Sequence, residues 1–163
     1  MKKIFFIFLL ISSYGFSQDM TIDKLDFIIK KNADSTAVNG NSWNFAVNGK
    51  LMICIADKNA NRMRIISPIS KQEKLSEELL LNSLIANFHT ALDVKYAISD
   101  GVLWSVFIHP LKELSTHQVE DAISQVYYAS ETFGTIYTST NLTFPGNTKK
   151  KKEVKKKPVL EKI

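Results

Sequence analysis

The amino-acid sequence predicts an α+β domain in which helices pack on an antiparallel β-sheet. Apolar residues recur at helical spacing in three segments, and the segments between them show the two-residue alternation of strands, broken by tight-turn signals. The predicted order is α-β-β-β-α-β-β-α, which gives a five-stranded antiparallel sheet packed by helices. A length of 163 residues and a hydrophobic content of 45% fit one domain around a single core.

The first half of the chain is predicted to form a helix followed by a three-stranded meander. Residues 21–33 carry apolar residues at helical spacing, and residues 34–41 form a polar link. Asn48-Gly49 is a strong hairpin signal, and residues 58–61 form a second turn. The three strands are expected at residues 43–47, 50–57 and 62–66.

The second half is predicted to form a long helix, a β-hairpin and a last helix. Both helices are preceded by capping-box spacing, which occurs at Ser70 with Glu73 and at Ser115 with Gln118. We expect the long helix to end near Leu92 and the last helix near Gly134. The hairpin strands are expected at residues 94–98 and 102–108, on either side of Asp100-Gly101.

The N-terminus has the features of a secretory signal peptide. Lys2 and Lys3 precede an apolar run, Ile4 to Ile11, that is too short to span a bilayer, and small residues precede a cleavage site placed after Ser17. The mature chain is therefore expected to be exported, to the periplasm or outside the cell. The predicted division is a signal peptide at residues 1–17, a folded domain at residues 18–138 and a disordered lysine-rich tail at residues 139–163.

The formal net charge of +5 belongs to the tail. From Pro145 onward the chain has eight lysines and two glutamates, whereas residues 18–144 hold 11 basic and 14 acidic residues. The run from Lys149 to Lys157 is either a solvated charge run or an anchor on an anionic envelope surface, where each lysine would contribute about 1 kcal/mol. Nucleic acid is not an expected partner of an exported chain.

The sequence carries no motif of a catalytic, cofactor or metal site. It has no nucleophile elbow, phosphate-binding loop, helical zinc pair or paired cysteines. Cys54 lies in an apolar run and is predicted to be buried, and the three histidines lack metal-ligand spacing. Asp57 to Asn61 resembles the start of a calcium loop, but Arg62 and Pro68 stand where Gly and Glu are required. A plain hairpin turn is therefore predicted there.

The two tryptophans leave two interpretations open. Trp43 and Trp104 lie on predicted alternating strands, where large aromatic side chains are usually part of the core. The alternative is a small-ligand-binding or enzymatic domain with a pocket near Trp43 and Trp104, in which several polar groups converge.

Four short motifs lie on the predicted elements: Trp43-Asn44-Phe45, Leu84-Ile85-Ala86-Asn87-Phe88, Ala97-Ile98-Ser99-Asp100-Gly101-Val102-Leu103-Trp104, and Pro110-Leu111 with Leu114. Together with the element order, they resemble the type III secretion chaperone-like superfamily, which includes the Tir-chaperone type and the YbjN-like proteins, over about Thr21 to Tyr137. The resemblance implies a non-enzymatic fold, usually dimeric, whose members hold partly unfolded client segments on exposed apolar surface. The signal peptide and the lysine tail depart from the family pattern, because secretion chaperones meet their clients in the cytoplasm.

The long helix carries more apolar residues than packing on one sheet face requires. At i, i+4 spacing, Leu80, Leu84 and Phe88 form one row, and Leu81 and Ile85 form a second. We expect one row in the core and the other at a protein interface. The hypothesis is a non-enzymatic, chaperone-like module without cofactors that works as a homodimer and binds proteins or unfolded segments.

The predicted removal of the signal peptide can be tested on the purified product. The purified product should begin at or near Gln18 and should fractionate outside the cytoplasm, because the signal peptidase removes the preceding residues. N-terminal sequencing with cell fractionation checks this. An intact Met1 on a cytoplasmic product would contradict it.

Overall fold

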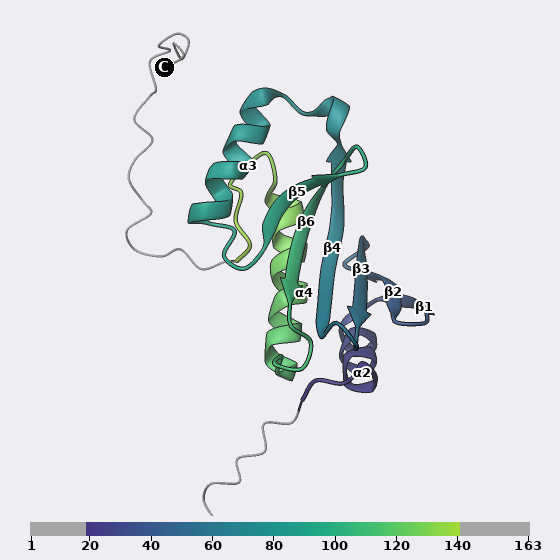
Figure 1. The fold of residues 1–163 in the computed structure, drawn as a ribbon. Coiled ribbons are helices and arrows are strands. Elements are labelled where there is room, and N and C mark those ends of the chain that lie inside the picture. The colour runs from purple at the N-terminus through teal and green to yellow at the C-terminus, as the bar shows by residue number, and fades with distance from the viewer. Residues whose placement is uncertain (1–18, 141–163) are drawn as a thin grey trace, which may run out of the picture.

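Six β-strands form one antiparallel sheet in the computed structural model, which describes residues 19–140 (Figure 1). The sheet order is β1-β2-β3-β4-β6-β5, so the predicted α+β class with an antiparallel sheet is confirmed. The elements in chain order are α2 (Ile22–Asn32), β1 (Ser35–Asn39), β2 (Ser42–Val47), β3 (Lys50–Asp57), β4 (Arg62–Lys71), the 3-10 turn η1 (Gln72–Lys74), α3 (Glu77–His89), β5 (Lys95–Ser99), β6 (Val102–His109) and α4 (Thr116–Thr132).

The sheet has one strand more than predicted. β1 lies in the segment predicted to be a polar link. It pairs along its whole length with β2, from Ser35 opposite Ala46 to Asn39 opposite Ser42. Four of its five residues are exposed, because β1 is an edge strand at the margin of the sheet. An edge strand with little to bury does not need the apolar alternation by which strands are recognised in a sequence.

The boundary between β4 and α3 also differs from the prediction. β4 continues to Lys71 and pairs with β6, and a register shift between Pro68 and Ser70 accommodates the proline. The N-cap of α3 is Ser76, whose side chain accepts a hydrogen bond from the backbone N–H of Leu79 (3.2 Å). The capping box predicted at Ser70 is therefore wrong, since that residue belongs to the strand, and the helix also ends earlier than expected.

The predicted turns and the predicted cap of the last helix are found in the structure. The central residues of both predicted hairpin turns have positive φ angles, 49° and 74° at Asn48-Gly49 and 51° and 72° at Asp100-Gly101. The Asp57 to Asn61 segment is a hairpin turn in which the carboxylate of Asp57 accepts from two backbone N–H groups. Ser115 and Gln118 form the predicted capping box.

The core lies between one face of the sheet and the helices α2 and α4. Along the strands the fully or nearly fully buried residues alternate, so they all point to this face; they include Trp43, Phe45, Met52, Cys54, Met63, Ile65, Leu103 and Phe107. The helix α4 packs on β4 and β6, and α2 packs on α4 and on the β1–β2 margin (Figure 1). Trp43 donates its indole N–H to Asp26 of α2 (2.9 Å).

The chain after α4 returns to the end of α3. Tyr137 and Ser139 are buried, and the backbone N–H of Ser139 donates to the carbonyl of Thr90 (3.3 Å). The segment after α4 is therefore packed against the domain at these two residues. The predicted signal peptide and the lysine run lie outside the described residues. Within residues 19–140, none of the helices has the length and apolar character needed to cross a membrane.

The helix α3 lies beside the edge strand β5 (Figure 1) and is joined to it by a side-chain amide. Asn87 accepts a hydrogen bond from the backbone N–H of Tyr96 (2.7 Å) and donates one to its carbonyl (3.1 Å). The amide therefore replaces a neighbouring strand at this point of the sheet edge.

The Asn87 amide makes a stability prediction. Asn87→Ala should lower the free energy of unfolding by about 1–2 kcal/mol, because both backbone groups of Tyr96 lose their partner at a half-buried site. Urea denaturation followed by circular dichroism measures it. Asn82→Ala is the matched control: Asn82 is half-buried on the same helix, and its side chain makes no hydrogen bond within residues 19–140. Equal losses for the two variants would contradict the bridging role.

Candidate protein-binding surfaces

The helix α3 is unusually exposed for an apolar helix. Of its 13 residues, Ser83 and Ala86 alone are buried. The large side chains point to solvent, with exposed fractions of 59% for Leu81, 65% for Leu84, 49% for Ile85 and 85% for Phe88. An apolar stripe of this kind on a surface marks a binding site more often than chance exposure does. We call these four residues the α3 face.

The expected division of α3 into a core row and an interface row is wrong. In the row Leu80, Leu84 and Phe88, Leu80 is half-buried and the other two are exposed, and both members of the second row are exposed as well. The physical reason is the position of the helix. Because α3 lies beside the edge strand β5 and not on the covered face of the sheet, small residues suffice to make its contact.

A second apolar surface is the sheet face opposite α2 and α4. The strand residues that alternate with the buried ones point to this side, where Leu51, Ile55 and Ile108 are 49%, 43% and 59% exposed. Cross-strand pairing places Ile53 next to Ile66 and Ile66 next to Val106. We call this surface the open sheet face; it comprises Leu51, Ile53, Ile55, Ile66, Trp104, Val106 and Ile108.

The two tryptophans do not line a common pocket. Trp43 is 1% exposed and faces the helices, opposite Cys54. Trp104 lies between the buried residues Leu103 and Ser105 on β6, so its side chain points to the open sheet face. The sheet itself separates the two indoles, so they do not share the pocket that the alternative interpretation requires.

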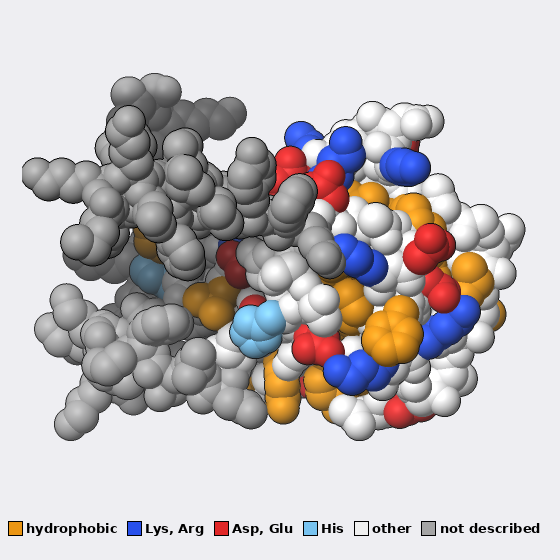
Figure 2. Space-filling view, turned by 90° about the horizontal axis from the view of Figure 1, so that it is seen from below, with side chains coloured by type: hydrophobic (Ala, Val, Ile, Leu, Met, Phe, Trp, Pro, Cys, Tyr) orange, Lys and Arg blue, Asp and Glu red, His pale blue; other side chains and the backbone are white. Residues whose placement is uncertain are grey.

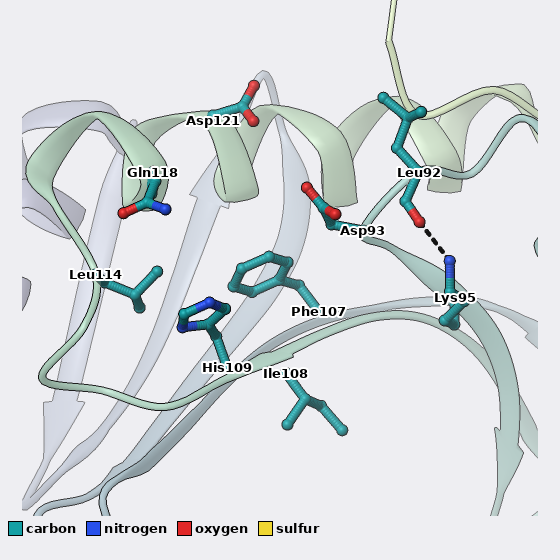
Figure 3. A pocket seen from close by; sticks show the side chains of 9 residues that line it. All are labelled: Leu92, Asp93, Lys95, Phe107, Ile108, His109, Leu114, Gln118 and Asp121. Carbon is teal, nitrogen blue, oxygen red and sulfur yellow. Dashed lines mark hydrogen bonds between the residues drawn. The ribbon is translucent and has the colours of Figure 1, made fainter.

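A hollow of about 410 Å³ lies elsewhere, between the ends of β5 and β6 and the start of α4 (Figure 3). Its apolar lining residues are Leu92, Phe107, Ile108 and Leu114. The ring of Phe107 stacks on that of His109, with 5.9 Å between the ring centroids. Asp93 and Asp121 are its acidic lining residues. This hollow is a candidate place for a small ligand if the alternative function held.

The polar groups around this hollow have structural partners. The buried amide of Gln125 donates to Asp121 (2.7 Å) and Asp93 (3.3 Å), which ties α4 to the loop before β5. The ammonium group of Lys95 donates to the carbonyls of Leu92 and Asn87 at the end of α3. The Nδ1 atom of His109 lies 2.8 Å from the carbonyl of Pro110. These contacts hold neighbouring segments together, and no nucleophile among them is paired with a base.

The described residues form neither a cluster of metal ligands nor a reactive thiol. Within residues 19–140, no three or more His, Cys, Asp and Glu side chains come together as a metal site would require. Cys54 is fully buried, and burial raises the pKa of its thiol to about 12. Burial likewise raises the pKa of Tyr96 to about 12. Cys54 is thus the buried hydrophobe that its apolar run predicts.

Figure 2 looks at the end of the molecule that carries α2, where hydrophobic side chains at the surface are interleaved with charged ones. Phe27 of α2 is 67% exposed there, beside Asp23 and Lys24. A single exposed apolar residue among charges is ordinary for a protein surface. The α3 face and the open sheet face, which contain several large apolar residues each, are therefore the stronger candidates.

Comparison with known proteins supports the fold. No protein-family model matches the chain, and none of the curated proteins matches it. The structure is similar to a chain of the solved HopA1-SchA chaperone-effector complex, with a TM-score of 0.54 and 12% sequence identity, over 68% of this chain and 90% of that chain. The domain therefore shares its overall fold with a chain of that complex. At this identity the likeness concerns the fold alone.

The buried thiol makes a chemical prediction. At pH 8, Cys54 should react with a disulfide reagent such as dithionitrobenzoate only when the domain unfolds, because a pKa raised from 9.0 to about 12 lowers the thiolate fraction about a thousandfold. Absorbance kinetics in a urea series measure it. Rapid labelling of the folded domain in buffer would contradict the prediction.

Proposed function

We propose that this protein is a non-enzymatic, chaperone-like module that binds proteins or unfolded protein segments and works as a homodimer. The observation that carries the proposal is the α3 face, four large apolar side chains that the folded subunit leaves in water. The fold supports it, because a solved structure of similar fold is a chaperone-effector complex.

The energetics favour covering the α3 face. Burying a large aliphatic or aromatic side chain contributes about 1.5–3 kcal/mol, so four such residues offer a substantial gross stabilisation to any partner. In a two-fold symmetric dimer each residue occurs twice at the interface. Helix α3 is also held rigidly at its C-terminal end by the Asn87 contacts to β5, which lowers the entropy lost on binding.

The alternative, a small-ligand-binding or enzymatic domain, has weaker support. The two tryptophans lie on opposite faces of the sheet. The 410 Å³ hollow offers carboxylates that a structural glutamine already engages. A protein-binding role instead uses surfaces that have no evident role inside the subunit.

The site of action is part of the proposal. The N-terminal sequence predicts a signal peptide, and from this prediction we infer that the partners are proteins of the periplasm or cell envelope. The lysine run Lys149 to Lys157 would serve there as a contact to an anionic surface. A role in loading secreted effectors in the cytoplasm is not proposed.

A double variant of the α3 face tests the proposed homodimer. The double variant Leu84→Asp, Phe88→Asp should give a folded monomer, because a buried and unpaired carboxylate costs several kcal/mol at an interface. The dissociation constant should rise at least about a hundredfold. Sedimentation velocity of the mature protein measures assembly, and circular dichroism confirms that the variant is folded.

Phe27→Asp is the matched control, since Phe27 is equally exposed but lies on α2. It should leave both assembly and folding unchanged. If the unmodified mature protein is already monomeric at high micromolar concentration, the homodimer is wrong, and the α3 face is then the surface that binds other proteins.

A further inference from the structure

The open sheet face contains one charged group at a position where the neighbouring side chains are apolar. Arg64 of β4 pairs across the sheet with Ile55 of β3 on one side and with Ile108 of β6 on the other. All three side chains point to the same face, because directly paired residues share a face of the sheet. The side chain of Arg64 makes no hydrogen bond or ion pair within residues 19–140.

The surface around Arg64 is hollowed. A depression of about 290 Å³ is lined by Ile55, Asp57, Arg62, Met63, Arg64 and Ile108. Two of its charged groups have local hydrogen-bond partners: one oxygen of Asp57 accepts from the backbone of its own turn, and Arg62 donates to the carbonyl of Asn61 (3.0 Å). Arg64 differs from both, because all the hydrogen-bond donors of its guanidinium are available to a partner.

The chemistry of a partner follows from this arrangement. A partner segment that covers Ile55 and Ile108 with apolar side chains also removes water from the guanidinium of Arg64, and an unpaired buried charge is costly. A carboxylate of the partner offsets the cost of burying this charge best, because it accepts two parallel hydrogen bonds from the planar guanidinium. We propose that the open sheet face binds an amphipathic protein segment that places an Asp or Glu on Arg64 and apolar side chains on either side of it. This inference rests on the proposed protein-binding function and states the chemistry of the bound segment.

The charge of Arg64 also excludes one occupant. The lysine run of the chain itself has the same sign as Arg64 and lacks the large apolar residues that the two isoleucines would contact. The open sheet face therefore favours segments of other proteins that contain both acidic and apolar residues. Repulsion between Arg64 and the lysines disfavours binding of the chain's own lysine run to this face.

A peptide selection tests the proposal. A random phage-displayed peptide library is panned against the immobilised mature protein, and the enriched peptides are synthesised and titrated by fluorescence anisotropy. We expect them to combine an Asp or Glu with large apolar residues. Replacing that acidic residue by its amide should weaken binding about tenfold, as loss of a charge-assisted pair does.

Protein variants locate the site. Arg64→Glu should weaken binding more than tenfold, Arg64→Lys should weaken it less, and Ile108→Asp should abolish it, since Ile108 is 59% exposed and flanks the arginine. Phe27→Asp should retain binding, and the α3 variant Leu84→Asp, Phe88→Asp is measured beside it to separate the two surfaces. Circular dichroism shows that each variant is folded.

Several results would overturn the inference. Enriched peptides without carboxylates, or peptides that bind Arg64→Glu as tightly as the unmodified protein, show that Arg64 does not select the partner. If the α3 variant alone loses the peptides, protein binding stands and the site is wrong. If Arg64→Glu converts a dimer to a monomer, a second copy occupies the open sheet face, and a failure to enrich any peptide counts against both proposals.

Discussion

The packing of α4 on the central strands β4 and β6 is the interaction on which the rest of the structure depends. Ser67 and Ser105 are fully buried on the covered face. Ser105 donates its hydroxyl to the carbonyl of Val126 in α4 (3.0 Å), and the hydroxyl of Tyr96 donates to that of Ala129 (2.9 Å). Small, satisfied hydroxyl groups let the helix approach the sheet without leaving buried polar atoms unpaired. The helix thereby fixes β5 as well, and with it the position of α3.

This packing places α2 and α4 on one face and leaves apolar residues elsewhere in water. The α3 face lies beyond the edge strand, and the open sheet face lies on the far side of β3, β4 and β6. The two surfaces differ in chemistry: α3 presents large aliphatic and aromatic residues, whereas the open sheet face has Arg64 among isoleucines. Such a difference suits two kinds of contact, one with a second copy and one with an acidic apolar segment.

Much of the fold could be predicted because its signals are local. The turns at Asn48-Gly49 and Asp100-Gly101 depend on two residues each, and the cap at Ser115 depends on Gln118 three residues on. The strand β1 was missed because an exposed edge strand has no apolar alternation, and its pairing with β2 is set by the neighbouring strand. The cap at Ser76 was missed because Ser70 offered the same local pattern.

The sequence by itself determined the element types, the α+β class and the surplus of apolar residues in the long helix. Each of these follows from how apolar residues repeat along the chain, every two residues in a strand and every 3.6 residues in a helix. The tertiary structure decided which residues are exposed. It placed Trp43 and Trp104 on opposite faces, turned both rows of α3 toward solvent and set Arg64 between Ile55 and Ile108. These outcomes depend on which elements pack together, and contacts between residues far apart in the chain, such as those of Tyr96 with Ala129, are not encoded in any local pattern.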